Sequence, residues 1–156
     1  MKGHASVVEL LNECLTAELT AINQYFVDAK MFEHWGYERL AARFREDSID
    51  EMRDAEALVD RILYLESMPN LQRLGTVAVG ETVGEKLAAA LALEVEAVSR
   101  LNLGIATCME HDDHGSRDVL QTILRGEEEH ADWLEAQLGL VAQLGEANYL
   151  AQQLRA

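Results

Sequence analysis

The chain has 156 residues, of which 49% are hydrophobic and 26% are charged. This length and composition are typical of one globular domain with a full core, so we expect residues 1–156 to form a single domain. The 28 acidic residues exceed the 13 lysines and arginines, which gives a formal net charge of −15. A charge of this sign argues against binding to nucleic acid or to an anionic membrane and leaves metal cations as candidate partners.

The sequence predicts neither a targeting segment nor a membrane span. An amphipathic pattern starts directly after residue 4, so no secretory hydrophobic segment is expected. The longest apolar run, residues 87–93, has 7 residues, whereas a transmembrane helix needs about 20. Two cysteines, Cys14 and Cys108, are too few for a disulfide framework. These features favour a reduced, cytoplasmic setting.

Helical periodicity dominates the first half of the chain. Over residues 7–32 an apolar stripe recurs every three or four positions and is interrupted by Glu18. A second stripe covers residues 40–65, and Gly36 between the two predicts a short turn between antiparallel helices. Over residues 66–84 the period lapses at a proline and several glycines. A connection of this length predicts a crossover along the bundle rather than a hairpin.

The second half repeats this organisation. Helical stripes cover residues 87–108 and 120–141. Between them the pattern breaks, and Ser116 is the expected N-terminal cap of the fourth helix. Gly145 ends that helix, and residues 146–154 can form a short fifth helix. No segment has the period of a strand. The sequence therefore predicts an all-α, ferritin-like four-helix bundle, with a long crossover between helices two and three and a short C-terminal fifth helix.

Ionisable residues interrupt all four stripes near their middles. They are Glu18 in the first segment, Asp47, Glu51 and Asp54 in the second, Glu94 in the third, and Glu127 and His130 in the fourth. One acid on an apolar stripe is more often partly solvated than functional. Four interruptions at similar depth need another explanation, because unpaired charges in a core cost several kcal/mol each.

A repeat of 76 residues relates the two halves of the chain. The equivalent pairs are Glu18 and Glu94, Glu51 and Glu127, and Asp54 and His130. Two helix pairs related by a pseudo-twofold axis would bring these side chains around one point. One glutamate from each of two helices and Glu-x-x-His from each of the other two form the di-iron and di-manganese carboxylate sites. Because carboxylate and imidazole suit Fe²⁺ and Mn²⁺, we predict a di-metal site here.

Position 54 departs from this pattern, because the first copy has Asp54 where the second has His130. Aspartate can still bind a metal, but it is shorter than histidine and adds a charge. Five carboxylates and one imidazole leave one net negative charge around two divalent ions. We therefore expect that one carboxyl stays protonated in the Fe²⁺ state, or that Fe³⁺ is held more tightly. Either effect would slow oxidation.

Several segments resemble bacterioferritin, the haem-containing branch of the ferritins, and the resemblance covers essentially the whole chain. They are MKG at residues 1–3, AINQYF at 21–26, SIDEM at 48–52, LE at 65–66, PNLQ at 69–72, HADWLE at 130–135 and NYL at 148–150. The resemblance implies homodimers that assemble into a hollow shell of twenty-four subunits. The shell would oxidise Fe²⁺, store a ferric mineral, and release it with the help of a redox partner.

The family's ferroxidase ligands match Glu18, Glu51, Glu94, Glu127 and His130, and the sixth is histidine where this chain has Asp54. Two functions therefore stay open. One is an iron-storage subunit whose ferroxidase activity is reduced by the aspartate. The other is a mainly structural, haem-bearing release subunit that co-assembles with an active second bacterioferritin subunit type. A di-metal oxidase of the rubrerythrin kind is weaker, since that family adds an iron site held by four cysteines.

The resemblance also implies haem b, held at a subunit interface by one methionine from each partner, and Met52 is the matching position. Met52 lies about 100° around its helix from the inward-facing Glu51, which places it on the flank of the bundle. The matching flank of the first helix consists of Leu19, Ile22, Asn23 and Phe26. On spacing alone, a methionine on a flank more often packs at an interface. The resemblance favours haem ligation and an electron path for iron release.

Three further residues are candidates near the site. Tyr25 lies seven residues beyond Glu18 on the same stripe. It is expected either to donate a hydrogen bond to a metal ligand or to pack as an ordinary core aromatic. Glu46 and Asp50 lie beside the site, where they either line the cavity and attract iron or form a solvated acidic face.

Overall fold

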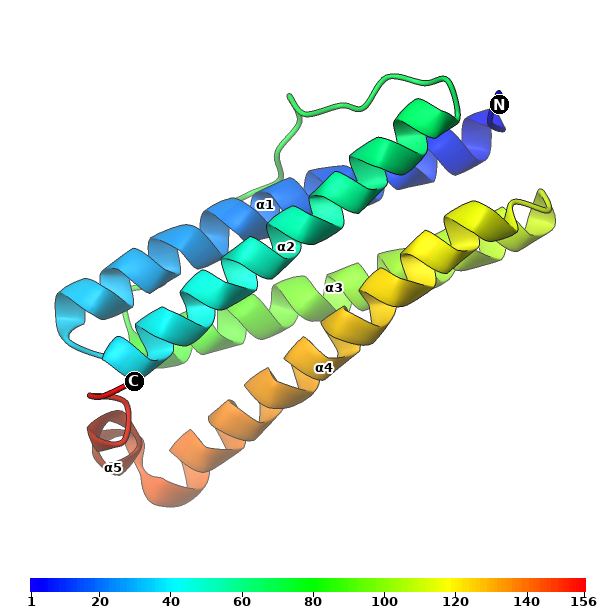
Figure 1. Cartoon of the computed structure of the whole chain (residues 1–156). Helices are drawn as coiled ribbons and strands as arrows, with labels where there is room; N and C mark the ends of the chain where they lie inside the picture. The colour runs from blue at the N-terminus through cyan, green and yellow to red at the C-terminus, as the bar shows by residue number, and fades with distance from the viewer.

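The computed structural model describes all 156 residues and contains five helices and no strand (Figure 1). The helices are α1 (Ala5–Trp35), α2 (Glu38–Tyr64), α3 (Val83–Glu110), α4 (His114–Leu144) and the short α5 (Glu146–Ala151). The predicted four-helix bundle with a crossover and a fifth helix is confirmed. No helix is both long enough and apolar enough to cross a membrane.

The long helices form two antiparallel pairs, α1 with α2 and α3 with α4 (Figure 1). The turn of the first pair is made by Gly36, whose φ of 91° lies in the left-handed region that glycine adopts without strain. The backbone N–H of Tyr37 then donates to the carbonyl of Phe32 at 2.9 Å and closes the end of α1. The short turn predicted at this glycine is therefore present.

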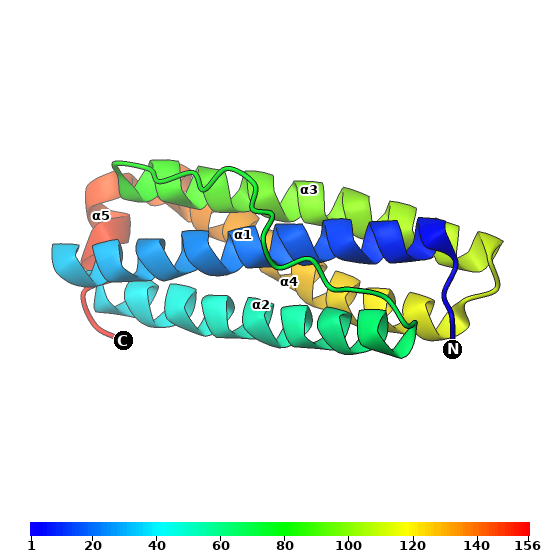
Figure 2. The same ribbon diagram turned by 90° about the horizontal axis from the view of Figure 1, so that it is seen from above.

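Residues 65–82 connect α2 to α3 and pass over α1 from one end of the bundle to the other (Figure 2). From residue 66 onward none of these residues is buried. Three polar side chains of α1 instead accept hydrogen bonds from the backbone of the crossover. These are Asn12 from Asn70 at 2.8 Å, Thr20 from Gly75 at 2.8 Å, and Gln24 from Ala78 at 3.0 Å.

The start of α4 differs from the sequence prediction. The helix begins at His114, and its cap is Asp113 rather than Ser116. The Asp113 carboxylate accepts from the backbone N–H of Ser116 at 3.0 Å and from its hydroxyl at 2.7 Å. Arg61 of α2 sets this arrangement, because it pairs with Asp113 at 2.8 Å and packs against Gly115, where a Cβ would lie 2.5 Å from the guanidinium. The contact with Arg61 of α2 thus favours an earlier start of α4, so that the helix includes Gly115.

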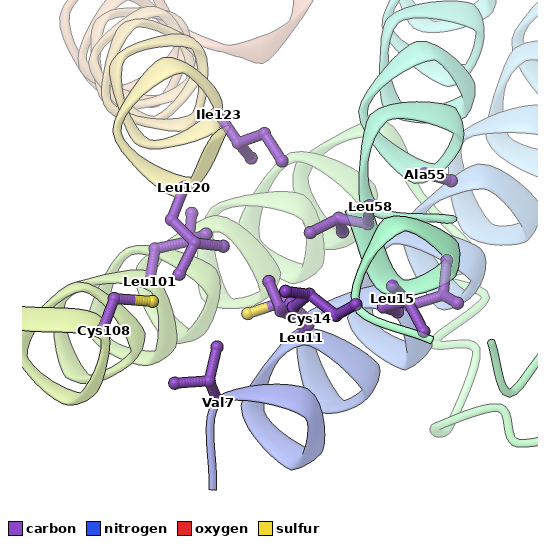
Figure 3. Packing of buried hydrophobic residues seen from close by; sticks show 12 residues of the cluster. Val7, Leu11, Cys14, Leu15, Ala55, Leu58, Leu101, Cys108, Leu120 and Ile123 are labelled. Carbon is purple, nitrogen blue, oxygen red and sulfur yellow. The ribbon is translucent and has the colours of Figure 1, made fainter. Parts of the chain in front are cut away.

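The apolar core consists of two clusters, one towards each end of the bundle. The first is aliphatic and contains both thiols, and Figure 3 shows side chains of all four long helices pointing into it. Its members are Val7, Leu11, Cys14, Leu15, Ala55, Leu58, Ile62, Leu65, Leu101, Cys108, Leu120 and Ile123. The second cluster holds the buried aromatic residues, including Tyr25, Phe32, Phe44 and Tyr149. The residues that interrupt the stripes lie between the two clusters on every long helix.

A buried ion pair joins α1 to α3 beside the aromatic cluster. Lys86 Nζ lies 2.9 Å from Asp28 Oδ1, and both side chains are completely buried. The ammonium group also lies 5.6 Å from the centre of the Trp35 ring. Burial raises the pKa of Asp28 to about 6, although the hydrogen bond and charge of Lys86 oppose that shift. The sequence analysis did not anticipate this pair.

Candidate metal centre

Six ionisable side chains meet in the middle of the bundle, between the two apolar clusters. They form two overlapping groups whose ligand atoms lie within 4.8 Å of one another. One group is Glu51, Glu94, Glu127 and His130, and the other is Glu18, Glu51, Asp54 and Glu127. Glu51 and Glu127 belong to both groups. The two ends of the cluster differ, with Glu94 and His130 at one and Glu18 and Asp54 at the other.

The glutamates of this cluster are almost fully removed from solvent. Glu18, Glu94 and Glu127 are exposed by 3%, 1% and 2%. One oxygen each of Glu18 and Glu94 is buried without a hydrogen-bond partner. No lysine or arginine forms an ion pair with any of the five carboxylates. Since isolated buried charges are strongly unfavourable, the donor set fits a bound cation as its missing partner.

Burial shifts the protonation of the carboxyl groups that α1 and α2 contribute. Burial and the negative charge of Asp54 raise the pKa of Glu18 to about 8, although a hydrogen bond with Glu51 opposes this shift. Burial and the charge of Glu18 raise the pKa of Glu51 well above its usual value. Burial, together with Asp50 and Glu94, raises the pKa of Asp54 to about 7. A metal ion that binds near neutral pH must therefore displace protons from these groups.

His130 is held between two carboxylates. Its Nδ1 lies 3.0 Å from Glu94 Oε1, and its Nε2 lies 3.0 Å from Asp47 Oδ2. Burial alone would lower its pKa, but the contacts with Asp47 and Glu94 outweigh burial and raise the pKa to about 9. Its Nδ1 is thus the ring nitrogen that faces Glu94 of the cluster.

Asp47 lies beside the cluster but in neither group, and the sequence alone predicts no role for it. Its carboxylate lies against His130 and accepts hydrogen bonds from Arg43 Nε at 3.1 and 3.2 Å. The signal for it was present, because Asp47 interrupts the α2 stripe one helical turn before Glu51. The sequence does not show whether such an acid faces the imidazole or the metal, since this depends on how the helices are rotated.

Tyr25 contacts both the cluster and the aromatic core. Its hydroxyl donates a hydrogen bond to Glu94 Oε1, and its ring packs edge-on against Phe44 and His130. Burial, followed by the charge of Glu94, raises the Tyr25 pKa well above its usual value. The group therefore stays a hydrogen-bond donor to the Glu94 carboxylate at physiological pH.

Two cavities reach the cluster from different faces of the bundle. One of about 430 Å³ lies beside α1, α3 and the crossover and is lined by Glu18 and Glu94. The other, of about 280 Å³, lies beside α2 and α4 and has no hydrophobic lining residue. Asp54 and His130 line the second cavity, and Glu51 and Glu127 line both. Small ions and dioxygen can therefore approach the same side chains from two directions.

The two acids expected beside the site have different surroundings. Asp50 lines the cavity beside α2 and α4 and forms an ion pair with Arg53 at 2.6 Å. Glu46 is exposed and lines neither cavity. The structure thus brings Asp50, but not Glu46, next to the metal-ligand cluster.

The residues predicted for haem lie together on the outer flank of α1 and α2. Met52, Phe26 and Ile49 are exposed by 63%, 53% and 42%. Leu19 and Ile22 are partly buried against the aliphatic cluster. The side chain of Asn23 is exposed and donates to the carbonyl of Leu19 at 3.0 Å. Among the residues predicted for haem, Met52 and Phe26 are thus exposed, and Leu19 and Ile22 are partly buried.

Known proteins resemble this chain over nearly its whole length. A family model described as Ferritin-like domain matches residues 8–144. The bacterioferritin of Mycobacterium leprae is 54% identical over 152 residues, which cover 97% of this chain and 96% of the relative. Bacterioferritin BfrA of Mycobacterium tuberculosis is 50% identical over 152 residues, which again cover 97% of this chain and 96% of the relative. The bacterial ferritin of Pseudomonas aeruginosa is 44% identical over 155 residues, which cover 99% of this chain and all of the relative.

Proposed function

Because this chain belongs to the bacterioferritin family, we propose that residues 1–156 form one ferritin-like subunit of an iron-storage shell in the cytoplasm. The subunit binds Fe²⁺ at the central cluster and oxidises it. The observation that carries the proposal is a set of five carboxylates and one imidazole without a lysine or arginine partner. Carboxylate and imidazole donors suit Fe²⁺, and bound cations would supply the positive charge that the buried carboxylates lack.

Each residue has a distinct role in this proposal. Glu51 and Glu127 contact both Fe²⁺ ions, which makes the pair of ions one oxidation unit. His130 with Glu94 binds one ion, and Asp54 with Glu18 binds the other. Two Fe²⁺ ions give up one electron each, and dioxygen takes up both electrons with two protons to form hydrogen peroxide. The carboxyl groups release protons when iron binds, so protons are available at the site.

Ferroxidase activity is reduced in this proposal by the charge of Asp54, and iron storage is kept. An extra carboxylate binds the Fe³⁺ product more tightly than a neutral imidazole would, which slows its departure to the mineral. The same residue favours a second candidate function, a structural and iron-release subunit that assembles with an active second subunit type. Mass analysis of shells from the native source separates the two, because two subunit masses support co-assembly and one mass contradicts it.

Haem b at a twofold interface is the second part of the proposal. The exposed thioether of Met52 beside the apolar side chains of Phe26 and Ile49 fits a flat apolar group shared with a second subunit. Bound there, haem supplies one-electron transfer for reducing the mineral, fed by a redox partner. Met52 would bind its iron, and Leu19, Ile22 and Asn23 would line the group. An unchanged haem absorbance in Met52→Leu would contradict this role.

The proposed function is tested by titrating the pure, metal-free chain with Fe²⁺ without oxygen and then admitting oxygen. We expect two Fe²⁺ per subunit to bind and then to oxidise together, in particles of the mass of a shell of twenty-four subunits. Glu127→Gln is the informative variant, because it weakens the contacts to both ions at once. Oxidation by the wild type that is no faster than oxidation without protein would contradict the ferroxidase proposal.

A further inference from the structure

The two ends of the metal-ligand cluster differ in donor chemistry. Apart from the two shared glutamates, one end has a carboxylate and the imidazole of His130, whereas the other has the carboxylates of Glu18 and Asp54. The second end therefore has only oxygen donors and one more negative charge. Both ends have buried atoms without a hydrogen-bond partner, Glu18 Oε2 at this end and Glu94 Oε2 and His130 Nε2 at the other.

The surroundings of the two ends differ as well. Polar groups of the other helix pair contact the imidazole end, where Tyr25 donates to Glu94 and Asp47 lies against His130. The 76-residue repeat gives the equivalent positions of these two supporting residues as Leu101 and Ile123. Both are members of the aliphatic cluster and offer no hydrogen bond. The imidazole end thus receives a hydrogen bond from Tyr25 and a contact from Asp47, whereas the equivalent residues at the all-oxygen end are apolar.

We propose that the two positions select different divalent metals. When Mn²⁺ is present together with a metal that prefers imidazole, such as Fe²⁺ or Zn²⁺, Mn²⁺ binds at the Glu18 and Asp54 position and the other metal at the Glu94 and His130 position. The inference rests on the proposed function only in requiring that the cluster binds two divalent ions. Such selection makes the cluster a mixed-metal site when both kinds of metal ion are present.

Donor preference supports this assignment. Imidazole suits Zn²⁺, Fe²⁺ and Cu²⁺, whereas carboxylate and water suit Mn²⁺, Mg²⁺ and Ca²⁺. Among the last three, Mg²⁺ gives up its water reluctantly and Ca²⁺ takes six to eight oxygens. A buried site with Glu18, Asp54 and two shared carboxylates satisfies neither of these ions well. Mn²⁺ is therefore the oxygen-preferring ion that fits best.

The test uses Mn²⁺ and Zn²⁺ as probes, because Mn²⁺ is paramagnetic and Zn²⁺ is silent. The metal-free, assembled protein receives one equivalent of each per subunit without oxygen and is desalted to remove ions on the acidic surface. Pulsed electron paramagnetic resonance then detects whether a histidine nitrogen binds the Mn²⁺. We expect retained Mn²⁺ without nitrogen coupling in the wild type, and with nitrogen coupling in Asp54→His.

Two further variants keep the test decisive. Asp54→Asn retains an oxygen donor but lacks the charge, so Mn²⁺ should remain free of nitrogen coupling and be released more readily. We expect the Mn²⁺ affinity to fall by at least about tenfold, since loss of an outer hydrogen-bond partner alone costs about 10–100-fold. Asp60→Asn, an exposed neutral exchange elsewhere on α2, is the control and should behave as the wild type.

Nitrogen coupling to Mn²⁺ in the wild type would overturn the inference and leave the proposed function intact, provided that both metals are retained. Retention of neither metal after desalting would overturn both, because the cluster would then not be a metal site. An absence of nitrogen coupling in both the wild type and Asp54→His would also contradict the inference, since Mn²⁺ would then not occupy the position next to residue 54.

Discussion

The two helix pairs of this protein, α1 with α2 and α3 with α4, are copies with the same ligand spacing and different surroundings. At the metal-ligand cluster, the first pair has Asp54 where the second pair has His130. At the contacts between α1 and α3, the repeat relates Asp28 and Lys86 to Gly104 and Leu10. The first two residues form a buried ion pair, whereas a Cβ at Gly104 would lie 2.9 Å from Leu120 and 3.8 Å from Leu10.

This difference shows which features the repeat preserves. The glutamates that would bridge two metals, Glu51 and Glu127, are identical in the two copies, because both ions depend on them. The contacts that join the two pairs are not preserved, since one end of the bundle uses charge and the other uses close apolar packing. The fold therefore accepts either an ion pair or apolar packing at the contact between α1 and α3, whereas the metal-ligand cluster depends on the position of its shared carboxylates.

The largest expected effect comes from removing one partner of the ion pair between α1 and α3. Lys86→Met leaves the Asp28 carboxylate buried without a partner, which should reduce the free energy of unfolding by about 3–5 kcal/mol. Replacing both residues, as Asp28→Leu with Lys86→Met, should restore most of the lost free energy of unfolding, because the equivalent contact at the other end of the bundle is already apolar. Chemical denaturation measures both variants, and equal losses in the single and double variants would contradict this role of the pair.

The second prediction concerns the pH dependence of the metal-free protein. Folding raises the pKa of Glu18 to about 8 and of Asp54 to about 7. The stability that protonation gives these acids is present below their unfolded pKa and is lost as the pH rises through the folded values. The melting temperature of the metal-free protein should therefore fall by several degrees between pH 5 and pH 8.5.

The raised pKa of His130, about 9, acts in the same direction, because a histidine with a raised folded pKa also loses its contribution as the pH rises through that value. Bound metal replaces the protons, so loading with Zn²⁺ should remove most of the fall and release protons on binding. A melting temperature of the metal-free protein that rises over this pH range would contradict the buried acidic centre.

The third prediction gives the two metal positions the same donor types. Asp54→His removes one negative charge and gives both helix pairs the same Glu-x-x-His motif. We expect Fe²⁺ oxidation to become about tenfold faster, which corresponds to a barrier lower by about 1.4 kcal/mol. Stopped-flow absorbance of the Fe³⁺ product measures the rate, with Asp60→Asn as the matched control. An unchanged rate in Asp54→His would show that the aspartate does not limit oxidation.

The smallest expected effect is at the apolar contact between the pairs. Gly104→Ala adds a Cβ that would lie 2.9 Å from Leu120, so that side chain must move. Overpacking of this kind costs about 1–3 kcal/mol, and the better helix propensity of alanine offsets about 1 kcal/mol. We expect a net loss of about 1 kcal/mol in chemical denaturation. Gly126→Ala in α4, which meets nothing within 4 Å, is the control and should be neutral or stabilising.

The bundle, its crossover and its cluster of ionisable residues were predictable because periodicity and the 76-residue repeat are local or internal signals. An acid on an apolar stripe is visible in the sequence, and the repeat indicates which acids meet. The role of Asp47 was not predictable, because it depends on the rotation of α2 relative to His130. Lys86 and Asp28 lie 58 positions apart, and no local pattern pairs them. The cap at Asp113 escaped prediction because Arg61, on another helix, sets it.

The central claim is that six side chains form two unequal metal positions around shared carboxylates. Calorimetric titration of the metal-free protein with Co²⁺ tests it most directly, because Co²⁺ binds to both carboxylate and imidazole donors. We predict two separate binding steps of one ion per subunit each, which merge into one step of two ions in Asp54→His. A single ion per subunit, or two ions in one step already in the wild type, would contradict the claim.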